Sequence, residues 1–90
     1  MEGAEKEEIM GQCAEMLEEH MSDLTVPRNI KRLVNKVKNE LRNGNGSQAL
    51  RATAVISDLE ELAVNPNILS HTRTLVWNLV SQLETVSVEE

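Results

Sequence analysis

Residues 26–46 read VPRNIKRLVNKVKNELRNGNG, an amphipathic segment with clear start and stop signals. Its apolar residues recur every three or four positions, as on one face of an α-helix, and form the stripe Ile30, Leu33, Val34, Val37 and Leu41. Pro27 is tolerated in the first turn, where its missing N–H costs no hydrogen bond. Asn43-Gly44-Asn45-Gly46 supplies a stop and a flexible turn. The segment therefore predicts a helix over about residues 26–43, with Thr25 as N-cap.

Three further segments show the same periodicity and are separated by helix breakers. We expect helices over about residues 4–21, 48–64 and 68–86, with Ser47 and Asn67 capping the last two. Their expected core faces are, in chain order, Ile9, Met10, Cys13, Met16, Leu17 and Met21; Ala52, Val55, Ile56, Leu59, Leu62 and Ala63; and Thr72, Leu75, Val76, Leu79, Leu83 and Val86. Leu50 and Ala54 add apolar surface on the other side of the third helix, which predicts a central helix approached from both sides.

An internal repeat relates the second helix to the fourth. A shift of about 42 residues places Lys31 on Arg73 and Leu33 on Leu75, and it also superposes the predicted caps. This offset lies within the period of HEAT-type helix pairs, about 40–47 residues, although two unrelated amphipathic hairpins would also align passably. Because every connection is short, we predict an all-α, antiparallel four-helix bundle built from two similar helix hairpins, a single domain over residues 1–90.

The composition restricts the compartment and the class of protein. Fifteen acidic and nine basic residues give a net charge of −6, and no apolar run approaches the roughly 18 residues of a membrane span. The first eight residues are polar and acidic, unlike a signal peptide, and a single Cys suits a reducing compartment. We therefore expect a cytoplasmic protein that does not bind a membrane.

The residues that could perform chemistry are few and scattered. Cys13 lies within an apolar stripe, where a small hydrophobe is commoner than a nucleophile. His20 and His71 have no partner at metal-ligand spacing, and the turn before Ser47 lacks the Lys of a phosphate-binding loop. We expect no catalytic residue, no metal and no cofactor, and therefore no enzyme.

The charges are strongly segregated along the chain. Residues 1–25 hold eight acids and one base, whereas residues 26–42 hold six bases and one acid. One interpretation pairs the basic second helix with the acidic first helix. The other leaves a basic face free to bind an acidic protein or the phosphates of RNA or DNA. The candidate residues of this anion-binding face are Arg28, Lys31, Arg32, Lys38 and Arg42.

Trp77 lies about 120° from the centre of the apolar stripe of its helix. It either folds over the edge of the bundle or anchors an interface, because Trp and Arg dominate contact energies. The candidate interface comprises Arg73, Trp77, Val80 and Glu84.

Three stretches carry a family resemblance: residues 26–32 (VPRNIKR), 51–57 (RATAVIS), and 65–67 with 71–78 (NPN, HTRTLVWN). With these the chain resembles Uncharacterised Protein Family 0147, short helical proteins of archaea, over about residues 5–86. The resemblance implies an archaeal cytoplasmic protein with a four-helix bundle fold, and it implies no activity and no functional residues.

Together these observations predict a non-enzymatic protein-interaction or adaptor domain. We expect it to bind an unknown protein partner, or itself as a homodimer, through its fourth helix. The alternative is nucleic-acid binding, in particular of RNA, through the basic face of the second helix.

Overall fold

Four helices make up most of the computed structural model, which describes residues 3–21, 27–43 and 46–88. They are α1 (Gly3–Met21), α2 (Arg28–Asn43), α3 (Gln48–Ala63) and α4 (Ser70–Val86). These three stretches of chain contain no β-strand.

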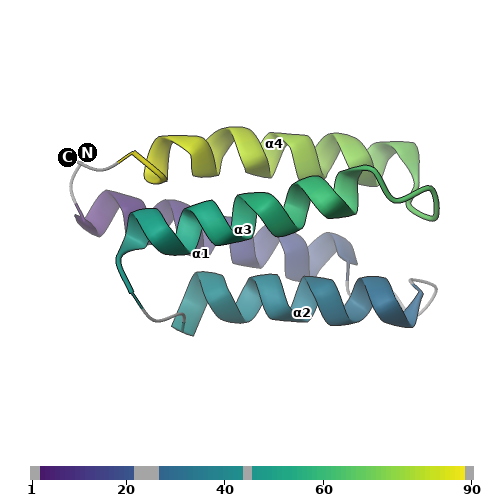
Figure 1. Cartoon of the computed structure of the whole chain (residues 1–90), viewed down its shortest axis with the longest axis horizontal. Helices are drawn as coiled ribbons and strands as arrows, with labels where there is room; N and C mark the ends of the chain where they lie inside the picture. Colours follow the sequence, from purple (N-terminus) through teal and green to yellow (C-terminus); the bar gives the residue numbers. More distant parts are fainter. Residues whose placement is uncertain (1–2, 22–26, 44–45, 89–90) are drawn as a thin grey trace.

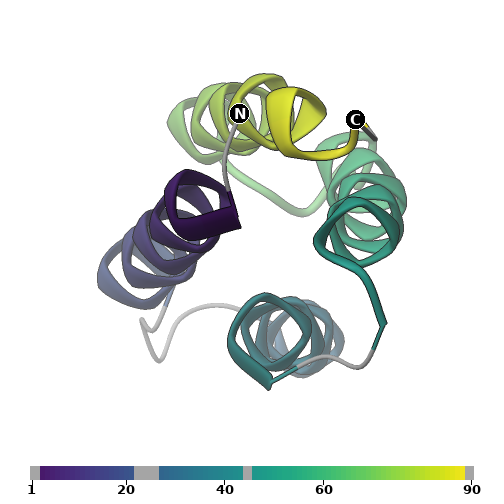
Figure 2. The same ribbon diagram turned by 90° about the vertical axis from the view of Figure 1, so that its left-hand side faces the viewer.

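The helices run alternately up and down the long axis of the molecule (Figure 1). Seen from the end they form a ring in chain order, with α4 returning to α1 (Figure 2). Packing is most extensive within the hairpins α1–α2 and α3–α4, and α1 also approaches α3 across the centre. The predicted all-α, antiparallel bundle of two hairpins is therefore confirmed. The HEAT-like relation between the hairpins stays a prediction.

The core consists mainly of aliphatic side chains from all four helices, as the stripes predict. Its buried members are Met10, Cys13, Ala14, Leu17, Ile30, Val34, Val37, Leu41, Ala52, Val55, Leu59, Leu62, Ala63, Val76, Leu79, Val80, Leu83 and Val86. Full burial of each large aliphatic side chain contributes about 1.5–3 kcal/mol, so this cluster is the main source of stability. The side chain of Met21, assigned to the core from the sequence, lies outside the described part of the structure.

One expectation about α3 is wrong. Leu50 is 62% exposed and Ala54 is also exposed, so α3 has no second apolar contact face. The physical reason is the ring arrangement: α2 and α4 flank α3, α1 lies across the core, and none of the described helices packs on the outer side of α3. The helix therefore belongs to the ring and is not central.

The predicted N-cap of α3 is confirmed, whereas the predicted N-cap of α4 is wrong. Ser47 caps α3, since its hydroxyl accepts a hydrogen bond from the N–H of Leu50 at 3.2 Å. The prediction that Asn67 caps the fourth helix is wrong, because α4 begins at Ser70 and Leu69 occupies the N-cap position. Instead the Asn67 N–H donates to Oδ1 of Asn65 at 2.8 Å, which forms a tight turn before the helix.

At the start of α2, the N–H of Lys31 donates to the carbonyl of Pro27 at 3.0 Å, so helical bonding begins at Pro27. The predicted cap Thr25 lies outside the described residues. Among the residues that are described, no helix combines the length and apolar character needed to cross a membrane.

Candidate interaction surfaces

The indole of Trp77 lies on the outer side of α4, and 45% of the residue is exposed. Its neighbours along the helix, Val76 and Leu79, are fully buried. The helical period turns Trp77 away from the stripe to which they belong. The position near water agrees with the helical wheel, and it leaves a large apolar ring available for contact.

The residues predicted to surround Trp77 have different environments. The Arg73 guanidinium is half-buried; Nε donates to the carbonyl of Ala63 at 2.8 Å, and Nη2 donates to that of Asn65 at 3.1 Å. Arg73 therefore satisfies the Ala63 carbonyl at the end of α3, which has no partner within the helix, and it also binds the Asn65 carbonyl in the turn that follows. The structure thus gives Arg73 a structural role, and its predicted part in an interface stays a prediction.

Val80 is only 4% exposed and belongs to the core, so its assignment to an exposed interface is wrong. The reason is the extensive packing between α3 and α4, which widens the buried side of α4 beyond the predicted stripe. Glu84 is exposed, as expected.

Two further apolar side chains are exposed at the ends of the connection between α3 and α4. Val64 is 74% exposed and follows Ala63, whose carbonyl binds Arg73. Leu69 is 65% exposed and immediately precedes α4. Trp77 follows Arg73 by one helical turn. We call Val64 and Leu69, at the two ends of the α3–α4 connection, together with Trp77, near the middle of α4, the turn surface.

The five predicted basic residues of α2 do not form one open face. Arg28 and Arg32 are exposed, whereas Lys31 and Lys38 are half-buried. Arg42 is turned towards α1, where its Nη2 lies 3.0 Å from Oε2 of Glu18. Part of the basic charge is therefore paired with acidic α1, as the structural interpretation of the sequence expects, and two arginines remain open to solvent.

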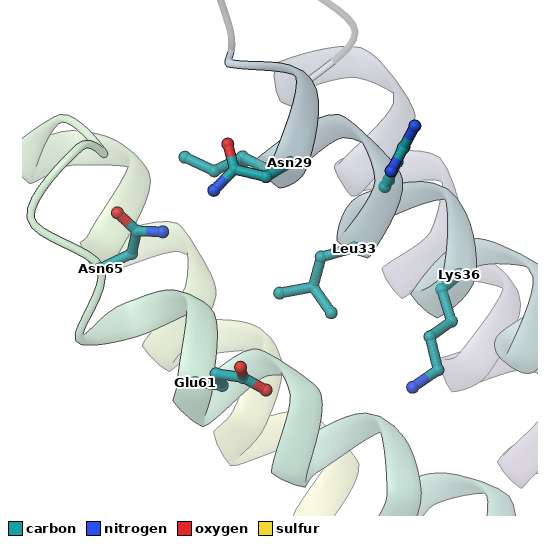
Figure 3. Close-up of a pocket in the computed structure, with 7 residues that line it drawn as sticks. Asn29, Leu33, Lys36, Glu61 and Asn65 are labelled. Carbon is teal, nitrogen blue, oxygen red and sulfur yellow. The ribbon is translucent and has the colours of Figure 1, made fainter.

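A groove of about 370 Å³ lies between α2 and α3. Figure 3 shows Leu33 projecting from α2 towards α3, with Asn29 and Asn65 on opposite sides. Its lining residues are Asn29, Ile30, Arg32, Leu33, Lys36, Glu61 and Asn65. Lys36 reaches towards α3, where its Nζ lies 3.5 Å from Oδ1 of Asp58. The periodicity of a single helix does not reveal this groove, because α3 contributes its acids and α2 its bases.

The opposite end of the bundle is closed by a polar network around Arg51, which is 8% exposed. Arg51 Nε donates to the carbonyl of Glu40 at 3.2 Å, and Nη2 donates to that of Leu41 at 2.7 Å. Nη1 lies 3.0 Å from Oε1 of Glu7, which also accepts from the Gln48 amide at 3.0 Å. One arginine thus joins the starts of α1 and α3 to the end of α2.

This network lowers the pKa of the Glu7 carboxyl, chiefly through the hydrogen bond from Gln48 and also through Arg51, while desolvation opposes the shift. The same end is joined to α4, because Lys6 Nζ donates to the carbonyl of Val88 at 2.9 Å. One feature of the sequence could have indicated this role of Arg51. It is a basic residue near the apolar side of the first turn of α3, shortly after the end of α2.

The chemically reactive side chains lie apart. Cys13 is fully buried in the core, its Sγ is 3.8 Å from Oε1 of Gln82, and burial raises the pKa of the thiol to about 11. His20 and His71 are exposed on α1 and α4. In the described part of the chain, no group of three or more His, Cys, Asp or Glu residues could hold a metal ion.

Comparison with known proteins places this bundle in a family. The chain is 47% identical to a UPF0147 protein of Methanosarcina mazei over 90 residues, covering 100% of this chain and 97% of the relative. It is 43% identical to a UPF0147 protein of Archaeoglobus fulgidus over 75 residues, covering 83% and 85% of the two chains.

Among solved structures, the crystal structure of unknown function protein MMP1188 is similar, with a TM-score of 0.78 and 36% sequence identity. The similarity covers 99% of this chain and 96% of that one. A model of the uncharacterised protein family UPF0147 matches residues 1–86. The chain therefore belongs to the uncharacterised protein family UPF0147.

Proposed function

We propose that this chain is a non-enzymatic protein-interaction or adaptor domain that works in the cytoplasm. It binds a protein partner, or a second copy of itself, through α4 around Trp77. The observation that carries the proposal is the exposed indole, 45% accessible, on a domain whose other large apolar side chains are mostly in the core. Of the four residues predicted for this contact, Trp77 and Glu84 are exposed, Arg73 is half-buried and Val80 is in the core.

The free energy expected from burial of Trp77 supports a role in binding. A Trp side chain buries about 150–250 Å², so the exposed part of Trp77 corresponds to roughly 70–110 Å². At about 25 cal/mol per Å², its burial by a partner contributes about 2–3 kcal/mol. That is the range of an interface hot spot.

A non-enzymatic role is supported by the state of the reactive groups. The Cys13 thiol lies in the core with a raised pKa of about 11, which disfavours the nucleophilic thiolate. The two histidines lie at the surface on different helices, so neither is placed to orient a nucleophile.

RNA binding by α2 is the second candidate, and one observation favours it: Arg28 and Arg32 are exposed and, within the described residues, have no ionic partner. The net charge of −6 and the pairing of Arg42 with Glu18 oppose it. Filter binding at two salt concentrations separates the candidates, since phosphate contacts weaken steeply with salt. Retention that Arg28→Gln and Arg32→Gln abolish would support RNA binding.

The main proposal is tested by affinity purification from cytosol with the wild-type chain and the variant Trp77→Ala. Leu50→Ala is the matched control, because Leu50 is an exposed apolar residue on the outer side of α3. We expect a protein that co-purifies with wild type and L50A and is lost with W77A. Self-association through the same surface would instead change the Trp77 emission on dilution. Equal recovery by all three chains, without a dilution effect, would refute the role of Trp77.

A further inference from the structure

We propose that the α2–α3 groove is a self-association surface, on which a second copy of this chain docks its own α2–α3 groove. The two copies are related by a two-fold axis that runs along the groove. Trp77 is not among the residues that line the groove, so this inference does not depend on the function proposed for Trp77.

The groove has two walls and an apolar floor. Asn29, Arg32 and Lys36 come from α2, at the spacing of one helix face, and Glu61 and Asn65 come from α3 and the turn that follows it. The eight positions from residue 29 to 36 extend over about 10 Å at 1.5 Å per residue. Leu33 is half-buried and points across the groove, so part of its apolar surface remains accessible at the centre (Figure 3).

The walls carry opposite charges. The α2 wall contributes Arg32 and Lys36, and the α3 wall contributes Glu61, with Asp58 close by. Lys36 already pairs with Asp58 inside one chain. Arg32 and Glu61 are both exposed, and across the described residues neither has an ion-pair partner within 4.0 Å. One unpaired cation and one unpaired anion therefore face the same groove from opposite walls.

A two-fold axis along the groove exchanges the walls. It places α2 of one copy over α3 of the other, so Arg32 of each copy meets Glu61 of its partner and the two Leu33 side chains meet near the axis. An axis across the groove would instead place α2 over α2 and bring like charges together. A two-fold interface must be self-complementary. The oppositely charged walls meet that condition only when the axis runs along the groove.

The test uses charge reversal and mixing. Sedimentation and light scattering over about 1 µM to 1 mM cover weak to moderate interfaces. We expect the wild-type chain to form dimers that weaken as salt is raised. Arg32→Glu places a carboxylate opposite the partner's Glu61, and Glu61→Arg places a guanidinium opposite the partner's Arg32. Each variant alone should therefore lose dimers by tenfold or more.

An equimolar mixture of R32E and E61R should dimerise again. In that mixed dimer the glutamate introduced at position 32 of one chain faces the arginine introduced at position 61 of the other. The native Glu61 and Arg32 that remain also face each other, so both contacts are attractive. No effect within a single chain produces this rescue. Circular dichroism checks that each variant keeps its helix content.

Matched controls reverse charge elsewhere. Arg28→Glu changes the charge of α2 outside the groove, and Glu15→Arg does the same on the exposed side of α1. Both should leave dimers largely intact. The variant Trp77→Ala should also form dimers normally. The groove dimer and the role proposed for Trp77 can therefore fail independently of each other.

Three results would overturn the inference: a wild-type monomer at every concentration, dimers that survive R32E, or two variants that do not rescue each other. E61R also distinguishes a second copy from an RNA or an acidic peptide as the occupant of the groove. A basic groove would bind such an anionic ligand more tightly, whereas the two-fold dimer is weakened by the same change.

Discussion

Replacing Arg51 with Met tests what holds the end of the bundle together. Arg51 is 8% exposed and spans three helices: it donates to the carbonyls of Glu40 and Leu41 at 3.2 and 2.7 Å and pairs with Glu7 at 3.0 Å. Met has a similar unbranched length, so the change removes the donors and the charge while it leaves little empty space.

The expected loss follows from these contacts. A hydrogen bond that involves a charged group contributes about 1.5–3 kcal/mol, and two such bonds go to main-chain carbonyls. The pair with Glu7 adds little, because the Glu7 side chain is half exposed. The freed carbonyls regain some water at the helix end, so we expect a loss of about 2–4 kcal/mol. For a domain of this size the whole free energy of unfolding is about 5–13 kcal/mol.

Urea unfolding followed by circular dichroism, at one fixed protein concentration, measures the change. A loss of about 3 kcal/mol corresponds to a fall in Tm of about 12–24 °C. Arg51→Lys should recover only part, because an ammonium group cannot serve three acceptors in this fork geometry. Arg28→Met, at an exposed position, should change stability by less than about 0.5 kcal/mol. A loss below about 1 kcal/mol for R51M would contradict the stabilising role of the Arg51 hydrogen bonds.

Other predictions concern the core, the thiol and one carboxyl. Leu59→Ala should cost about 2–5 kcal/mol in urea unfolding, and Leu50→Ala less than about 0.5 kcal/mol; equal losses would contradict the single-faced α3. With its pKa raised to about 11 and its Sγ buried, Cys13 should react with a maleimide only when the bundle opens, so fast labelling without urea would contradict the packing. The pKa of Glu7 is lowered by folding from its ordinary 4.5, so its stabilisation is complete above that value and is lost as pH falls through the folded pKa. Unfolding midpoints should therefore fall more steeply with acid in wild type than in Glu7→Gln, and parallel profiles would contradict the assignment.

Features that depend on local periodicity could be predicted from the sequence. The α2 stripe from Ile30 to Leu41 and the Ser47 cap require only the order of residues in one helix, and the structure confirms both. The outward position of Trp77 follows from the same geometry. Short connections then leave few ways for four amphipathic helices to bury their stripes.

Features that depend on which helices become neighbours could not be predicted. Val80 lies at the edge of the α4 stripe, and the extensive contact with α3 buries it. Arg73 and Arg51 reach carbonyls at the end of the preceding helix, which a single-helix pattern does not show. The α2–α3 groove combines bases of one helix with an acid of another, so it exists only once the bundle is assembled.

The function proposed for α4 requires Trp77 to contact a protein partner. Trp77 is the single Trp of the chain, so growth with 5-fluorotryptophan places one fluorine label at this site, and the ¹⁹F resonance is unaffected by Trp residues of an unlabelled partner. Addition of the co-purified partner should shift this resonance and remove its sensitivity to D₂O, since the indole leaves water. An unchanged, solvent-sensitive resonance in the saturated complex would contradict the claim.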